Sequence, residues 1–180
     1  MNSKQSVPFL IVVFVPLFAT LTYASEKSGW AMSAGIGSSV IKDRDGNETF
    51  DGNGFGYTWG LEYRFSRQWA LGIDLFSLGS ASDTFNSVNT TIDVGGMDIR
   101  GRIIFPLSEN VEMYGRLGFA GYFADVDPGT NNLGEDAVSL GLGLDIDRGE
   151  HFTIRLDGRY FDGPRDESGA LLTIGFNYRY

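Results

Sequence analysis

The chain has 180 residues, no cysteine, 25 glycines and a formal net charge of −9. The absence of cysteine excludes disulfide bonds and thiol chemistry, and the acidic balance argues against nucleic acid, whose phosphates call for a basic binding face. After residue 24 there is no sustained 3.6-residue apolar period and no apolar run long enough for a membrane-spanning helix. The composition and the patterning therefore predict an all-β protein.

The N-terminus has the pattern of a secretory signal peptide. Lys4 precedes an apolar run from Val7 to Leu21, and the segment Thr22–Ala24 places small residues where a signal peptidase cleaves. The apolar run is too short for a stable membrane anchor. We therefore predict cleavage at the end of this segment, which gives a signal peptide at residues 1–24 and a single mature domain at residues 25–180.

Eight later segments alternate apolar and polar residues, as β-strands with two unlike faces do. Each has about 10–14 residues, which is long enough for a tilted strand to cross a bilayer. The fourth segment is less regular than the others, and we expect a β-bulge at Gly95-Gly96. In chain order the segments are Trp30–Ile41, Phe55–Phe65, Trp69–Leu78, Ile92–Phe105, Val111–Ala124, Val138–Asp147, Phe152–Phe161 and Ala170–Tyr180.

The connections between these segments alternate between short and long. The short ones are Ser66–Gln68, Pro106–Asn110 and Arg148–His151, and the long ones are Lys42–Gly54, Gly79–Thr91, Asp125–Ala137 and Asp162–Gly169. The long connections are rich in Asp, Asn, Gly and Ser. Short periplasmic turns and longer extracellular loops are typical of membrane β-barrels, so the pattern predicts four acidic extracellular loops.

The two faces of the segments differ in a consistent way. One face is apolar and uncharged, with aromatic side chains at segment ends such as Trp30, Phe65 and Trp69. The other interleaves charged residues with glycine, as the cramped interior of an eight-stranded barrel requires. Its cations are all arginine, which suits buried bidentate pairs, whereas the mature lysines Lys27 and Lys42 lie outside the segments. We therefore expect the charged face to line the lumen and the apolar face to contact lipid.

Seven arginines and seven carboxylates lie on the charged face. Polar groups inside a membrane barrel cannot be satisfied by lipid, so charges of balanced number are expected to pair with one another. We interpret them as a structural lumen network. It comprises Glu62, Arg64, Asp74, Asp98, Arg100, Arg102, Glu112, Arg116, Asp145, Asp147, Arg155, Asp157, Arg159 and Arg179.

The final segment, Ala170–Tyr180, alternates strictly and ends on an aromatic residue. It resembles the C-terminal strand of bacterial outer-membrane β-barrels, which the barrel assembly machinery reads, and this implies an assembly signal at Phe176, Tyr178 and Tyr180. With the other segments, the mature chain resembles the small outer-membrane barrels, the OmpA transmembrane domain and the OmpX/Ail group, although many relatives carry Phe where Tyr180 stands. The resemblance implies an eight-stranded antiparallel up-and-down barrel, integral to the outer membrane, in contact with lipid and lipopolysaccharide.

For the function, the sequence favours a non-enzymatic protein that supports the envelope or interacts with a surface partner through its acidic loops. The sequence does not identify that partner. The main alternative is a narrow channel or carrier for small or hydrophobic solutes, of the OmpW type. A soluble periplasmic binder of the lipocalin type would alternate equally well with its faces reversed, but the glycine-rich charged face and the aromatic segment ends argue against it.

Enzymatic and metal-binding roles have weaker support. Some eight-stranded barrels that the chain resembles modify lipid A, and such chemistry typically needs a histidine that works with a serine and an acid. The one histidine, His151, lies in a predicted periplasmic turn, and there is no His-x-Ser motif. The segment Asp43–Asn47 only partly matches a calcium-binding loop. We therefore expect no catalytic residue, no cofactor and no metal.

Overall fold

The computed structural model describes residues 28–45, 48–85, 88–127, 133–163 and 168–180. The predicted signal peptide at residues 1–24 lies outside these ranges. Within them, no helix is long and apolar enough to cross a membrane.

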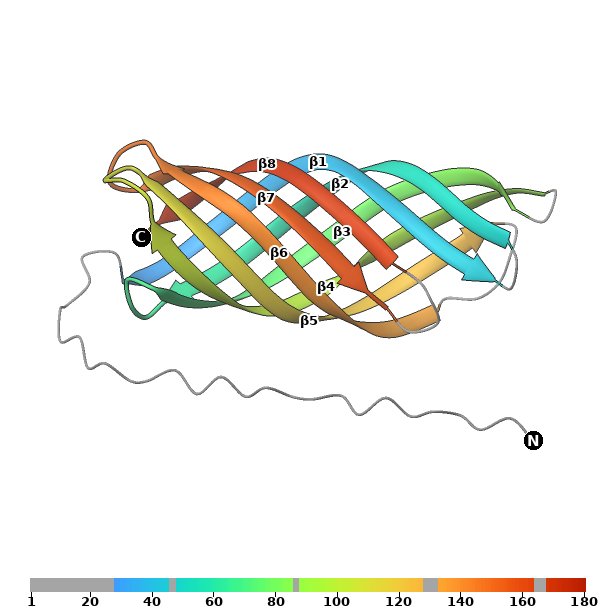
Figure 1. Ribbon diagram of the computed structural model, residues 1–180, viewed down its shortest axis with the longest axis horizontal. Helices are drawn as coiled ribbons and strands as arrows, with labels where there is room; N and C mark the ends of the chain where they lie inside the picture. The colour runs from blue at the N-terminus through green and yellow to red at the C-terminus, as the bar shows by residue number, and fades with distance from the viewer. Residues whose placement is uncertain (1–27, 46–47, 86–87, 128–132, 164–167) are drawn as a thin grey trace, which may run out of the picture.

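Eight strands build one closed barrel. In chain order they are β1 (Gly29–Asp45), β2 (Glu48–Arg64), β3 (Trp69–Phe85), β4 (Val88–Pro106), β5 (Val111–Asp127), β6 (Leu133–Asp147), β7 (Phe152–Asp162) and β8 (Ser168–Arg179). Every strand pairs antiparallel with its neighbour in the chain, and β8 closes the barrel on β1 (Figure 1). The all-β, eight-stranded up-and-down barrel predicted from the alternation is thereby confirmed.

The register fixes the tilt of the strands. When Cα partners are followed once around the barrel from Phe105 on β4, the path returns to the same strand at Gly95, ten residues away. In eight strands this stagger corresponds to a tilt of about 40°, so each residue advances about 2.5 Å along the barrel axis. The outward-facing row from Phe55 to Phe65 on β2 therefore spans about 25 Å, the height of the apolar band of outer-membrane barrels.

The barrel has two unlike ends. Three short turns, at residues 65–68, 107–110 and 148–151, lie at the end that carries the C-terminus, which we call the turn end (Figure 1). At the opposite end, which we call the hairpin end, β1 and β2 continue until only residues 46–47 separate them. In the same way, only residues 86–87 separate β3 from β4.

The predicted long loops are wrong in extent, because most of their residues belong to paired strands. The predicted loop Lys42–Gly54 is largely the end of β1 and the start of β2, and Gly79–Thr91 lies almost wholly in β3 and β4. Lys42 and Asp51, for example, are register partners and form an ion pair of 3.4 Å. Beyond the apolar band the outward residues, such as Lys42 and Asp51, are polar, so the apolar outward positions that reveal a strand are missing while the backbone continues to pair.

The β-bulge lies on the strand opposite the predicted site. Ser77 pairs with Gly95 and Gly79 pairs with Val94, which leaves Leu78 of β3 as the extra residue. Gly79 has a φ of +71°, a conformation that glycine adopts readily. The β4 strand, where we expected the bulge at Gly95-Gly96, continues through these glycines without an extra residue, and Val94 is buried. The irregular pattern of β4 therefore comes from apolar residues that face the lumen.

The outer surface is an apolar band with an aromatic rim. Near the middle of the band Leu142 is 69% exposed on the barrel surface. At the turn end, the rings of Trp30 and Tyr63 lie with their centroids 5.0 Å apart, and those of Tyr178 and Tyr180 lie 5.4 Å apart. Amphipathic aromatic side chains are enriched where a bilayer meets water. The band and its rim therefore have the form expected of a lipid-facing surface.

Candidate functional site

Twelve of the fourteen charged residues predicted for the lumen are buried inside the barrel. The other two, Asp147 and Arg179, are partly buried at the turn end, where Asp147 accepts a hydrogen bond of 2.9 Å from Thr153. The buried set holds six arginines and six carboxylates, and it is therefore electrically balanced. It comprises Glu62, Arg64, Asp74, Asp98, Arg100, Arg102, Glu112, Arg116, Asp145, Arg155, Asp157 and Arg159.

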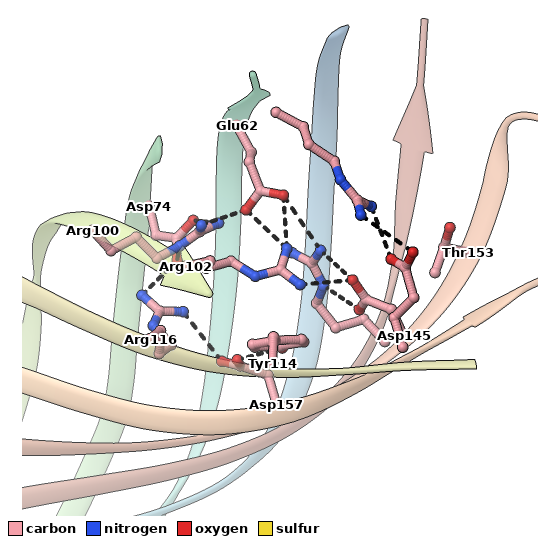
Figure 2. A network of polar contacts seen from close by, with 12 residues as sticks. Glu62, Asp74, Arg100, Arg102, Tyr114, Arg116, Asp145, Thr153 and Asp157 are labelled. Carbon is pink, nitrogen blue, oxygen red and sulfur yellow. Dashed lines mark hydrogen bonds and ion pairs between the residues drawn. The ribbon is translucent and has the colours of Figure 1, made fainter. Parts of the chain in front are cut away.

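The contacts among these buried charges form what we call the lumen ion-pair network (Figure 2), in which Arg100 joins two carboxylates. Its Nε and Nη2 donate to the two carboxylate oxygens of Asp74, at 2.9 and 3.0 Å. Its Nη1 donates to Glu62. Arg100 thus ties β4 to β3 and, one strand further, to β2, with the planar two-donor geometry that makes arginine suitable for buried carboxylates.

A second chain of ion pairs crosses the lumen. Arg102 donates from Nη1 to both oxygens of Glu62, at 2.7 and 2.9 Å, and from Nη2 to Asp145 at 2.8 Å. Arg155 of β7 binds the same Asp145 through Nε and Nη2, at 2.8 and 2.9 Å. These contacts connect β2, β4, β6 and β7, so the network bridges walls of the barrel that are far apart in the sequence.

The third part of the network surrounds Arg116 of β5. Its Nη2 donates to Asp74 at 3.0 Å and also to Asp98, and its Nη1 donates to Asp157 at 3.4 Å. Arg159 forms an ion pair of 2.9 Å with Asp74 and another with Asp157. The carboxylates of β3 and β7 therefore share two arginines, and Asp98 of β4 accepts from Arg116 and from the Ser139 hydroxyl.

Tyr114 takes part in the network, although it was not among the predicted site residues. Its hydroxyl donates to Asp157 at 2.6 Å, and the guanidinium carbon of Arg102 lies 3.7 Å from the centroid of its ring. Its place on the charged face, between Glu112 and Arg116, was the available signal. An aromatic residue inside a charged lumen combines a cation–π contact with a hydrogen bond.

Glycines make room for the arginines. A Cβ atom on Gly72 would lie 2.9 Å from Nη1 of Arg100, and one on Gly141 would lie 2.8 Å from Cδ of Arg116. These are closer than ordinary van der Waals contacts, and the main-chain oxygens of Leu61 and Gly158 are as close or closer, so a side chain at either position would displace an arginine and crowd the neighbouring strand. The interleaving of glycine and charge in the sequence therefore has a steric cause.

The ion pair between Arg64 and Glu112 lies at the turn-end side of the lumen ion-pair network. Nη1 of Arg64 lies 2.8 Å from a carboxylate oxygen of Glu112. The Nε of Arg64 also donates to the main-chain oxygen of Ser66 at 3.1 Å, and its Nη2 donates to that of Arg67. This arginine thus fixes the turn between β2 and β3 while it pairs a carboxylate of β5.

Toward the hairpin end the lumen changes from charged to apolar, which the sequence reading did not anticipate. The rings of Phe76 and Phe161 stack with centroids 4.5 Å apart and an interplanar angle of 21°. The alternation placed Phe76 and Leu171 on the charged face, and that interruption was the missed signal. We call this group the lumen apolar layer, and it comprises Ile41, Phe76, Leu78, Ala81, Ile92, Val94, Ala120, Ala137, Phe161 and Leu171.

The net charge of the chain is concentrated in the four segments predicted as loops. Residues 42–54, 79–91, 125–137 and 162–169 together contain twelve carboxylates and three cations. The remaining eleven cations and eleven carboxylates balance. Because β1 to β6 carry most of these segments to the hairpin end, that end of the barrel is strongly acidic.

The sequence also offered His151 and Asp43–Asn47 as candidate catalytic and metal-binding residues. His151 is exposed in a turn, where its Nδ1 lies 2.9 Å from the main-chain oxygen of Arg179, and this end is remote from the lumen apolar layer. Asp43–Asn47 falls outside the residues whose side chains are described. In the part of the chain that is described, no three His, Cys, Asp or Glu side chains are grouped so as to hold a metal ion.

The predicted assembly signal lies on the outer face at the turn end. Phe176, Tyr178 and Tyr180 all project outward and are exposed. The amide of Tyr180 donates to the main-chain oxygen of Trp30 at 3.0 Å, and its hydroxyl lies 2.7 Å from the sulfur of Met32. The last residue of the chain is therefore bound to β1, across the closure of the barrel.

Solved structures of small outer-membrane barrels share this architecture. Ail, the attachment invasion locus protein of Yersinia pestis, is 20% identical, with 86% of this chain and 99% of that chain covered and a TM-score of 0.59. Neisserial surface protein A is 15% identical, with coverage of 85% and 98% and a TM-score of 0.63. OprG of Pseudomonas aeruginosa is 13% identical, with coverage of 87% and 100% and a TM-score of 0.57. At these identities the likeness concerns the fold.

The comparison with curated protein sequences gave no match. The profile of a family described as the outer membrane protein beta-barrel domain matches residues 10–180, which include all eight strands. The match agrees with the closed barrel, its apolar outer band and its charged lumen. The chain therefore belongs to the outer membrane protein beta-barrel domain family and is an integral protein of the outer membrane.

Proposed function

We propose that this barrel is a non-enzymatic surface protein, which presents acidic hairpins to cationic partners outside the cell and uses its lumen as a structural core. The observation that carries the proposal is the distribution of charge. The buried lumen set is balanced, whereas twelve carboxylates and three cations belong to the four segments predicted as loops. A one-sided excess of this kind attracts cations and repels polyanions, and salt screens it over a Debye length of about 8 Å at physiological ionic strength.

The hairpins are pre-organised by cross-strand contacts. Lys42 pairs with Asp51 across β1 and β2, the hydroxyls of Ser82 and Thr91 lie 2.9 Å apart across β3 and β4, and the Ser80 hydroxyl donates to a carboxylate oxygen of a β4 residue beside this pair. The inward side chains of the same strands, such as Ile41, Ala81 and Ile92, belong to the lumen apolar layer. A surface that is already ordered loses less conformational entropy when a partner binds.

The proposal places the hairpin end outside the cell and the turn end in the periplasm, because the periplasmic turns of outer-membrane barrels are short. A signal peptide at residues 1–24 would direct export and be removed. Phe176, Tyr178 and Tyr180 would be read by the barrel assembly machinery, and the apolar band would contact outer-membrane lipid and lipopolysaccharide.

The charge of the hairpin end also predicts what the protein does not bind. Ail of Yersinia pestis has been crystallised with the heparin analogue sucrose octasulfate, which is a polyanion. The hairpin-end segments of this chain carry a fourfold excess of carboxylates over cations, so like charges would repel such a ligand. We therefore expect this barrel to differ from Ail in its choice of ligand, although the two share a fold.

The contacts in the lumen favour a structural core over a channel or an enzyme. The space inside eight strands is just wide enough for side chains to fill, and here arginines from β2, β4, β5 and β7 extend into it. Removal of one member would leave its partners with buried charge that is less well compensated, which is costly. Catalysis would need a reactive group in a cleft, and His151 instead lies exposed in a turn.

Five exposed carboxylates at the hairpin end allow a direct test. They are Asp51, Asp93, Asp125, Asp136 and Asp162. We expect intact cells that display the wild-type barrel to bind fluorescent oligolysine at low salt, and the variant with all five changed to Asn to bind several-fold less. The matched control is E109Q/E150Q, which removes two exposed charges from the turn end. Equal oligolysine binding by the five-fold variant and the wild type, at equal surface levels, would refute the proposal.

A further inference from the structure

The lumen is divided into two layers along the barrel axis, and individual strands show the boundary. On β7 the inward residues run from Arg155 through Arg159 and then reach Phe161. On β3, inward Asp74 is followed at the next inward position by Phe76. These two strands thus change from charged to apolar at a similar height, with the apolar part toward the hairpin end.

The charged layer contains polar atoms that the protein does not satisfy. Among the described residues, Nε of Arg102, Nε of Arg116 and Oδ1 of Asn177 are buried without a hydrogen-bond partner. Buried polar groups nearly always have a partner, and water supplies it where the protein does not. The charged layer is therefore suited to hold water.

The members of the lumen apolar layer offer water no side-chain hydrogen-bonding group. Phe76 and Phe161 belong to β3 and β7, which are on opposite sides of an eight-strand barrel, and their rings stack across the lumen. Every member of the layer is at most 8% exposed. Transfer of an ion or a polar solute into such a site is strongly unfavourable without compensating hydrogen bonds, and apolar constrictions block conduction by dewetting.

We propose that the lumen apolar layer is the permeability seal of the barrel, and that the lumen ion-pair network below it is hydrated from the turn end. The two layers then have different tasks. The network ties the strands together through ion pairs, while the stacked pair Phe76 and Phe161 excludes water and ions. This assignment is independent of the binding of cationic partners, and it makes solvent access to the lumen one-sided.

Single cysteines test the access directly, because the chain has none of its own. Ser33 faces the charged layer, since a Cβ on inward Gly60 would lie 2.8 Å from its hydroxyl, and Ala137 belongs to the apolar layer. In barrels reconstituted in liposomes, we expect 2-aminoethyl methanethiosulfonate to modify S33C and to leave A137C unmodified. Modification of A137C at a rate similar to that of S33C would overturn the proposal.

A conductance measurement tests the seal itself. The variant F76A/F161A removes the stacked pair, and F105A/F119A is the matched control, because Phe105 and Phe119 are exposed on the outer band. We expect discrete conductance steps in planar bilayers from F76A/F161A only, and modification of A137C in the F76A/F161A background. A folded F76A/F161A barrel that is as silent as the control, or a wild type that conducts, would overturn the assignment.

Two further variants keep this test decisive. Folding is checked for each variant by the gel mobility of unheated and boiled samples, since closed barrels stay folded in detergent until heated. If F76A/F161A does not fold, the milder F161S places a hydroxyl in the layer, and we expect it to conduct in its place.

The neutralised network variant E62Q should remain silent when folded, and conduction by E62Q would assign the seal to the ion pairs instead. Oligolysine binding should be unchanged in F76A/F161A, so failure of one proposal is distinguishable from failure of the other.

Discussion

Arg100 and Asp74 form a two-bond ion pair, at 2.9 and 3.0 Å, between adjacent strands in the middle of the barrel. Both side chains are excluded from solvent. Removal of either group would therefore leave buried charge on its partners.

We expect Arg100→Ala to reduce the free energy of unfolding by about 3–5 kcal/mol, because it leaves Asp74 and Glu62 with buried, poorly compensated charge. Arg100→Lys should reduce the free energy of unfolding by less than Arg100→Ala does, since it keeps the charge and loses the two-donor geometry. Urea unfolding of the barrel in lipid vesicles, followed by tryptophan fluorescence, measures both. The control is Arg148→Ala in an exposed turn, and an Arg100→Ala variant as stable as this control would contradict the importance of the network.

Tyr114→Phe should cost about 1.5–3 kcal/mol, because it removes the hydrogen bond to the Asp157 carboxylate and keeps the ring against Arg102. Tyr114→Leu should cost more, since it also removes the cation–π contact. The same urea unfolding experiment applies. Tyr160→Phe serves as the control, because Tyr160 faces outward, and an equal effect of the two Tyr→Phe changes would show that the lumen hydroxyl has no special role.

Leu142→Arg should destabilise the barrel by about 2–4 kcal/mol, because a charge near the middle of the apolar band faces hydrocarbon. Asp136→Arg on the same strand is the control, since it lies three outward positions nearer the hairpin end, where the expected cost is about 0–1 kcal/mol. Unfolding in vesicles compares the two variants. If Leu142→Arg inserts and unfolds like the wild type, the assignment of the outer face is wrong.

Removal of Tyr180 should lower the amount of protein that reaches the outer membrane. The residue lies on β1 through its amide and its hydroxyl, and the resemblance to C-terminal barrel strands implies that it is read during assembly. Tyr180→Phe should assemble normally, because it keeps the terminal aromatic ring. Quantification of outer-membrane fractions tests this, and equal levels of the truncated and full-length chains would argue against a terminal signal.

The strands and their facing could be predicted from the sequence because lipid requires the outward residues of the band to be apolar. Leu140, Leu142 and Leu144, with glycines between them and Asp145 directly after, leave no other facing for β6. The hairpin extensions could not be predicted in this way. At Lys42 and Asp51 the outward residues are polar, so backbone pairing continues without the apolar outward positions that mark the strands inside the band.

The lumen was predicted in composition but not in arrangement. Balanced arginines and carboxylates indicated mutual pairing, but which carboxylate Arg116 reaches depends on side-chain paths across the lumen that spacing does not encode. The apolar layer was missed because an apolar residue on a charged face, such as Phe76, is a small exception in one strand. It becomes a layer only when the barrel closure brings Phe161 and Leu171 to the same height.

The proposed surface role requires the hairpin end of the barrel to face the outside of the cell. Ser82 is exposed on a hairpin strand, and Ser108 is exposed in a short turn. In intact cells, a membrane-impermeant maleimide should label S82C and should label S108C only after the outer membrane is permeabilised. Labelling of S108C and not of S82C in intact cells would place the acidic hairpins in the periplasm and contradict the account.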